Sequence, residues 1–117
     1  MVPPLNHRGY AWVLLLLMGT TGAAALDPEA AVDAWDICLN EAAKGFATKT
    51  DEPADTIASG SFGYCQREER QYREAAAGRI GSNDAEAIIR LVRVFKEDRR
   101  ERLIALVMLT RIEAEQQ

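Results

Sequence analysis

Histidine is almost absent from this sequence: the one copy, His7, falls in a segment that we expect to be removed from the mature protein. A chain without an imidazole cannot form Ser–His or Cys–His nucleophile pairs, and it cannot offer histidine ligands to a metal ion. The sequence also lacks the motifs G-x-S-x-G and S-x-x-K and any glycine-rich phosphate-binding loop. We therefore predict a protein that is not an enzyme and that needs no cofactor and no metal.

Positive charge is also scarce. The 14 lysines and arginines are outnumbered by 18 aspartates and glutamates, which gives a net charge of −4 at pH 7. Proteins that bind nucleic acids usually carry a basic stripe, often with surface aromatic residues, and aromatic residues make up only 7% of this chain. We expect no nucleic-acid partner.

Long hydrophobic runs are few, and the longest, which includes residues 11–18, lies near the start of the chain. Arg8 precedes this run, and glycines and then Ala23-Ala24-Ala25 follow it. That order is typical of a secretory signal peptide with an A-x-A cleavage site, and the run is too short to span a bilayer, which takes roughly 20 residues. We predict that residues 1–25 are removed and that the mature protein is periplasmic or secreted, without a stable membrane anchor. An uncleaved amphipathic anchor is the alternative.

The remaining 26–117 are enough for one small domain, and their pattern is helical. Asp27 and Pro28 are typical of a helix start, because aspartate caps the first turn and proline suits the first helical position. Apolar residues then recur at helical spacing to about Thr48. After a polar turn, Pro53 begins a second helix that we expect to reach about residue 77.

Glycines are unusual inside that second helix, because each one costs about 1 kcal/mol relative to alanine. Gly60 and Gly63 occur in the stretch "SGSFG". Either the helix is broken there, or the small residues allow a third helix to approach closely. We favour an unbroken helix.

The last third of the chain contains no glycine or proline over residues 84–117. Ser82 or Asn83 could cap a helix that begins there. A charged block divides the apolar pattern into two helical segments, 84–98 and 101–115, which are either continuous or bent at their junction.

Cysteine is limited to Cys38 and Cys65, and each lies at the centre of the apolar face of its predicted helix. Both are equally far from the predicted turn at 51–52, so helices folded back about that turn bring the two sulfur atoms together. An even cysteine count in an exported protein favours a disulfide. A reactive pair normally has C-x-x-C spacing, and a metal site would need further soft or nitrogen ligands. We predict a structural disulfide.

Together these patterns predict an all-α fold, a small three- or four-helix bundle with a disulfide-stapled N-terminal helical hairpin. Residues 26–117 form a single helical domain in this prediction. The disulfide-linked hairpin occupies 26–77, and a long or bent C-terminal helix occupies 82–117.

Glu68 comes level with Trp35 in the antiparallel hairpin, so its carboxylate could accept a hydrogen bond from the indole N–H. A catalytic role for Glu68 or Glu69 would need a second inward carboxylate, which the pattern does not indicate. We expect a structural hydrogen bond at this position.

The C-terminal segment mixes arginines with acidic residues, and its run "LIALVMLTRI" is apolar around most of the helix circumference. The simplest interpretation is a surface with ion pairs and a buried core. The alternative is a partner-binding surface. Its candidate residues are Arg90, Arg93, Arg99, Arg100, Arg102, Leu106 and Leu109.

In size, predicted export, helix content and the two-cysteine layout that begins at "WDIC", the chain is similar in outline to bacterial periplasmic acid-stress chaperones. This resemblance implies one possible function, a holdase that exposes "LIALVMLTRI" when acid loosens its ion pairs. Our main hypothesis is a non-catalytic protein that acts by binding, of an accessory or an inhibitor and immunity type. Its partner would be another protein, or a second copy bound through the C-terminal helix.

Overall fold

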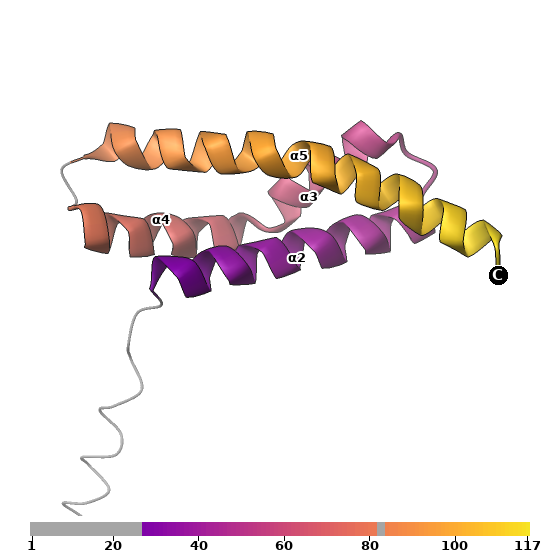
Figure 1. The fold of residues 1–117 in the computed structure, drawn as a ribbon, viewed down its shortest axis with the longest axis horizontal. Coiled ribbons are helices and arrows are strands. Elements are labelled where there is room, and N and C mark those ends of the chain that lie inside the picture. Colours follow the sequence, from indigo (N-terminus) through magenta and orange to yellow (C-terminus); the bar gives the residue numbers. More distant parts are fainter. Residues whose placement is uncertain (1–26, 82–83) are drawn as a thin grey trace, which may run out of the picture.

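The computed structural model describes residues 27–81 and 84–117, and within them it shows four α-helices and no strand. The helices are α2 (Pro28–Lys49), α3 (Ala54–Tyr64), α4 (Gln66–Ile80) and α5 (Ala85–Glu115). α2 runs in one direction, α3 and α4 return alongside it, and α5 packs against all three (Figure 1). The predicted all-α fold is confirmed. The predicted signal peptide lies outside the described residues.

α2 is the central helix and contacts the other three. The side chain of Asp27 caps it, with Oδ1 accepting a hydrogen bond from the N–H of Ala30 at 2.7 Å, and Pro28 begins the first turn. Apart from Trp35 and Leu39, the buried residues of α2 are alanines. Because alanine is small, three helices can pack closely around α2.

The second predicted helix is not continuous, so that prediction was wrong. α3 ends at Tyr64 and α4 begins at Gln66, with Cys65 between them at φ −98° and ψ 30°. Cys65 takes part in the last hydrogen bond of α3 and in the first of α4, and among the described residues no backbone hydrogen bond joins α3 to α4 directly. The N–H of Cys65 donates to the carbonyl of Ser61 at 3.0 Å, and the N–H of Glu69 donates to the carbonyl of Cys65 at 3.1 Å. The junction is therefore a kink, located at the residue that the disulfide joins to α2.

The glycines before the kink do not serve close packing of helices. A β-carbon at Gly60 or Gly63 would have no neighbour within 4 Å. Their effect is to weaken α3 next to the point where the chain changes direction. Gly81 has a different role, because its φ of 106° lies in the region that favours glycine, and α4 ends there.

α5 is one continuous helix of 31 residues rather than two segments. Asp84 caps it, with Oδ1 accepting a hydrogen bond from the N–H of Ala87 at 3.0 Å. Ser82 and Asn83, the predicted caps, lie outside the described residues. The charged block in the middle of α5 interrupts the apolar pattern but not the helix, because arginine, glutamate and lysine are good helix formers.

Trp35 is the centre of the hydrophobic core and is 0% exposed. Its ring stacks on Phe95 of α5 at a centroid distance of 4.1 Å and lies 5.8 Å from the ring of Tyr72 of α4. Leu103 and Val107 extend the core along α5. Trp35 of α2 thus contacts both α4 and α5.

The predicted hydrogen bond between Trp35 and Glu68 is absent. The indole Nε1 of Trp35 is buried and has no hydrogen-bond partner among the described residues. Glu68 lies beside the disulfide, and its carboxylate is 3.5 Å from Arg67. The prediction assumed two straight helices in mirrored register, and the kink at Cys65 removes that register.

Cys38 and Cys65 form the predicted disulfide, with a Cα–Cα distance of 6.0 Å. It joins the middle of α2 to the junction of α3 and α4. Disulfides persist mainly in oxidising compartments, so this bond agrees with an exported protein. Among the residues described, no helix is both long enough and apolar enough to cross a membrane.

Candidate partner-binding surface

α5 carries apolar residues on two opposite faces. One face is buried, where Val92, Leu103 and Val107 pack into the core. The residues on the opposite side follow one another at alternating steps of four and three along the helix, and all except the first are exposed. We name them the outer face of α5: Ala87, Leu91, Val94, Asp98, Glu101, Ala105, Met108 and Ile112.

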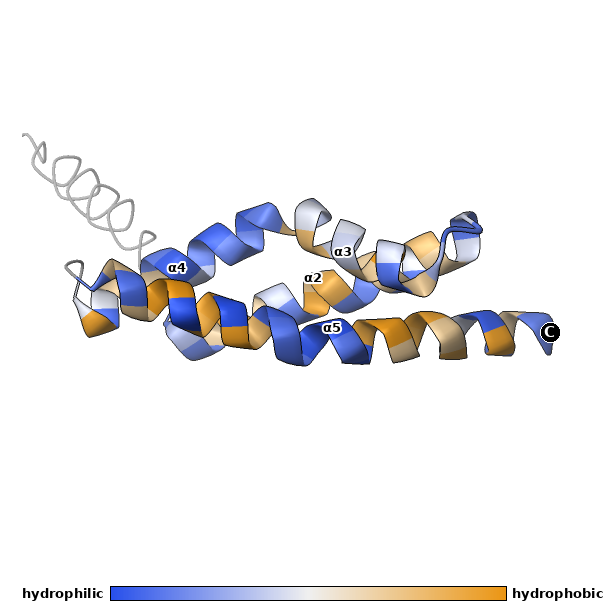
Figure 2. Ribbon diagram, turned by 90° about the horizontal axis from the view of Figure 1, so that it is seen from above, coloured by the Kyte–Doolittle hydropathy of each residue, from blue (hydrophilic) through white to orange (hydrophobic). Residues whose placement is uncertain are grey.

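The outer face has an apolar patch at each end. Val94, in the first patch, is 63% exposed, and Leu109 lies beside the second patch and is also exposed. Figure 2 shows hydrophobic residues toward both ends of α5 with hydrophilic residues between them. Single exposed apolar residues are common, but a row of them on one side of a helix is typical of an interaction surface.

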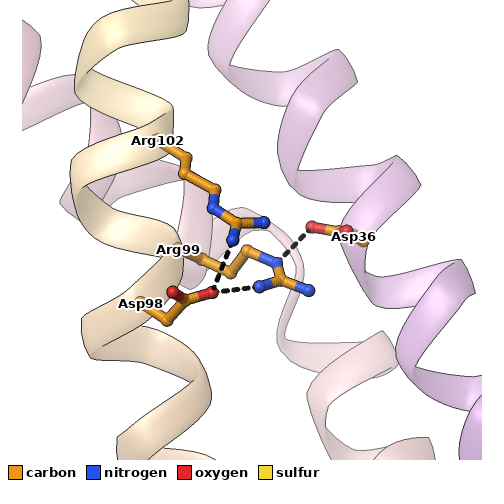
Figure 3. Close-up of polar contacts among 4 residues, drawn as sticks. All are labelled: Asp36, Asp98, Arg99 and Arg102. Carbon is orange, nitrogen blue, oxygen red and sulfur yellow. Dashed lines mark hydrogen bonds and ion pairs between the residues drawn. The ribbon is translucent and has the colours of Figure 1, made fainter.

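The middle of the outer face is charged. Asp98 pairs with Arg99 and with Arg102, the latter at 3.6 Å (Figure 3). Nε of Arg99 also donates to Oδ1 of Asp36 on α2 at 2.8 Å, and its guanidinium lies 4.6 Å from the ring centre of Phe95. Arg99 therefore holds α5 against α2, while Arg102 stays exposed at the edge of the outer face.

The C-terminal half of α5 is held to the end of α2. Nε of Arg111 donates to the carbonyl of Ala47 at 3.2 Å, and Nη2 donates to the carbonyls of Thr50 and Glu52 at 2.9 and 2.7 Å. The last carbonyl groups of a helix have no partner within the helix, so a guanidinium is a suitable donor to them. These bonds keep the second apolar patch on a supported helix rather than on a free end.

The predicted partner-binding residues divide between the two sides of α5. Those that are exposed are Arg90, Arg93, Arg100, Arg102 and Leu109. Arg100 donates to the hydroxyl of Ser59 at 2.7 Å. Arg99 and Leu106 turn toward the other helices, because Arg99 bonds to Asp36 and Leu106 packs against the core.

None of the eight residues of the outer face was among the predicted partner-binding residues. Met108 and Ile112 belong to the apolar run "LIALVMLTRI", and Leu91 and Val94 were not named in the prediction. These residues recur at steps of three and four along the sequence, and this spacing indicates one face of a helix. A second stripe with the same spacing lies on the other side of the helix, and only the packing of α5 shows which stripe is buried.

A concave surface of about 460 Å³ lies between α2 and the junction of α3 and α4. Its lining is mainly apolar and includes the exposed Ile37 and Tyr64. Both disulfide sulfur atoms and the Glu68 carboxylate lie within 4.8 Å of one another here. Sulfur atoms joined in a disulfide are not the thiolates that bind metals, so this cluster does not suit a metal ion.

Comparison of the chain with models of protein families, with curated proteins and with solved structures found no match. The interpretation of the surface therefore depends on its own geometry, which is a supported helix face with two apolar patches around a charged centre.

Proposed function

We propose that this is a small exported protein without catalytic activity, which acts by protein–protein association through the outer face of α5. In this proposal α2, α3 and α4 form a disulfide-stapled helical hairpin that serves as a scaffold, and α5 completes a helical bundle. The protein would be of an accessory or an inhibitor and immunity type, working in the periplasm or outside the cell.

The observation that carries the proposal is the exposure of the outer face. Six of its eight positions are apolar, and they occur at the spacing that a helix uses to pack against another helix. The helix beneath is held by Arg99 and by Arg111, so a partner would meet a surface that needs little ordering. Export is supported by the predicted signal peptide and by the disulfide.

Affinity capture with cross-linking from a native envelope extract tests the proposal. Val94→Glu is expected to reduce the cross-linked partner at least about tenfold, as for a charge placed in the apolar centre of an interface. Ile37→Glu on α2 is the matched control, because Ile37 is 58% exposed and also β-branched. The control is expected to retain the partner.

Equal recovery with Val94→Glu and with the wild type would contradict the proposal, and so would the absence of any cross-linked chain with the wild type. Circular dichroism of both variants shows whether they are folded. Both substitutions are at exposed helix positions, so we expect both to fold.

A holdase that acts in acid is the second candidate, and ion pairs between helices favour it. Each pair joins a carboxylate to a cation on a different helix: Glu29–Arg79 at 2.5 Å, Asp36–Arg99 at 2.8 Å and Glu69–Lys96 at 2.6 Å. Protonation of these carboxylates would remove all three links. The helices would then loosen, and the buried face of α5 would become accessible.

The pair between Glu29 and Arg79 determines in which direction the stability of the fold changes with pH. The hydrogen bond from Arg79 holds the pKa of Glu29 below its ordinary value of 4.5. Because the pKa is lower in the folded state, the pair stabilises the fold above the ordinary pKa, and this contribution is lost as the pH falls through the folded value. Glu29→Gln should therefore be slightly less stable than the wild type above about pH 5 and equal to it in strong acid.

Denaturant unfolding at a series of pH values measures this difference, and Glu41→Gln on the exposed side of the same helix is the control. A constant difference at every pH would show that the pair has no such role. Light scattering of an aggregating client near pH 3 tests the holdase itself. A protein that stays fully folded there and leaves the client to aggregate is not an acid-activated holdase.

A further inference from the structure

The order of residue types along the outer face of α5 is the same from either end of the helix. Three apolar residues come first, two acidic residues follow, and three apolar residues come last. A surface that binds a second copy of itself across a two-fold axis must be complementary to itself. The apolar ends of this face meet that condition when the second helix runs in the opposite direction, whereas its acidic centre comes against the acidic centre of the second copy and needs a compensating positive charge.

The spacing of the outer face agrees with this geometry. Its steps alternate between four and three residues from Ala87 to Ile112, which is the pattern of the seam between two coiled helices. α2 and α3 pack on the other side of α5, and α4 reaches the seam only at its end, where Ile80 borders a hollow with Ala87, Leu91 and Val94. A second helix can therefore lie along the exposed positions from Leu91 to Ile112, with Ile80 beside its path.

We propose that the outer face of α5 binds α5 of a second copy of this chain, with the two helices antiparallel. This inference rests on the proposed function and names the partner.

One register places apolar residues against apolar residues at both ends. In it Leu91 lies opposite Met108, and Val94 lies opposite Ala105. A shift by one heptad would set Asp98 opposite Met108 and Glu101 opposite Ala105, which would bury each carboxylate against an apolar side chain. The order of residue types therefore selects a single antiparallel register.

The sizes of the side chains favour the antiparallel arrangement over the parallel one. In the antiparallel register the small Ala105 meets the larger Val94, and Ala87 meets Ile112, so neither alanine meets a second alanine. In a parallel pair Ala105 would meet its own copy and leave a gap, because cores lose stability where side chains fail to fill the space. Antiparallel helices also place the opposite ends of their dipoles together.

This register places Asp98 opposite Glu101 of the second copy, and Arg102 supplies the positive charge that compensates this acidic layer. Arg102 is one turn beyond Asp98 on the same edge of the seam, and its side chain is 68% exposed. In the antiparallel pair, Arg102 of the second copy comes level with Asp98 on that edge. Each Asp98 carboxylate would then lie between its own Arg102 and that of the second copy, which offsets the approach of Glu101. A polar layer of this kind fixes register in paired helices.

Cysteine cross-linking tests the arrangement with the full mature protein. Val94→Cys and Ala105→Cys are prepared separately, mixed and treated with a short bis-maleimide. We expect the mixture to give a cross-linked dimer that contains one copy of each variant, with a yield at least about tenfold above that of Ala105→Cys alone. Val94→Cys mixed with Ile37→Cys is the control and should give no dimer.

Each outcome has a distinct meaning for the two proposals. A strong cross-link of Ala105→Cys to itself would show parallel helices and overturn the inference. Monomers in every mixture would overturn it too. If the envelope capture still recovered a different protein through Val94, the proposed function would stand without the inference. If that capture also failed, both would fall.

Discussion

Replacement of Trp35 with alanine is expected to lower the free energy of unfolding by about 3–5 kcal/mol. Trp35 is fully buried, stacks on Phe95 and lies near Tyr72, so its loss leaves a large cavity where α2, α4 and α5 meet. Denaturant unfolding followed by circular dichroism measures the change. Total stabilities of small domains are about 5–15 kcal/mol, so this single substitution should come close to unfolding the protein.

Trp35→Phe and Tyr64→Ala make the test specific. The indole N–H has no hydrogen-bond partner in the part of the chain that the structure describes, so phenylalanine keeps the ring contacts without breaking a polar interaction there, and its cost should be much smaller. Tyr64 is an exposed aromatic residue that packs edge-on against Phe46 at a centroid distance of 5.7 Å, so its loss should cost only about 0.5–1.5 kcal/mol. If Trp35→Ala were as stable as Tyr64→Ala, the core would not be centred on Trp35.

Removal of the disulfide is expected to cost about 3 kcal/mol. The bond closes a segment between two cysteines that are 27 positions apart, and it joins α2 to the kink between α3 and α4. Loop-closure entropy predicts this size of effect, because the open chain gains freedom mainly in the unfolded state. The double variant Cys38→Ser/Cys65→Ser should unfold at a clearly lower denaturant concentration than the oxidised wild type.

The reduced wild type is the natural comparison, because it has the same sequence without the bond. It should unfold close to the double variant, with a small difference for the polar serine at the fully buried position 65. Equal midpoints for the oxidised and reduced wild type would show that the disulfide does not stabilise the fold. The kink at Cys65 would then have to be maintained by packing alone.

The features that the sequence predicted correctly depend on local chemistry or on equal distances along the chain. Asp27 and Pro28 mark a helix start through hydrogen bonding and a fixed φ, whatever the helix packs against. The disulfide was predicted because Cys38 and Cys65 both lie on apolar faces at equal distances from a turn. A kink of one residue does not prevent the two sulfur atoms from meeting.

The features that were missed depend on the path of the chain in space. The kink at Cys65 could not be predicted, because the glycines near it are compatible with an unbroken helix. Once it is present, the mirrored register that placed Glu68 beside Trp35 no longer holds. The outer face of α5 was missed for another reason: two apolar stripes with the same spacing lie on one helix, and residues such as Arg99 and Phe95 decide which one is buried only through contacts with α2.

The two proposals leave a clear division of the molecule. In them, Trp35 and the disulfide would stabilise a scaffold, and the outer face of α5 would be where the protein meets another chain. The charged centre of that face explains why an otherwise continuous apolar pattern is interrupted without any break in the helix. In the proposed pair each Asp98 would come opposite Glu101 of the second copy, so the register would depend on Arg102 to compensate these carboxylates.

The molar mass of the mature protein in solution tests the central claim most directly. We expect static light scattering to give twice the monomer mass for the wild type and for Ile37→Glu, and the monomer mass for Val94→Glu. Glutamate at position 94 would put a new charge opposite Ala105 of the second copy, whereas position 37 lies on α2 away from the seam. Monomers for all three proteins up to roughly 0.1 mM would contradict the claim that the outer face of α5 binds a second copy.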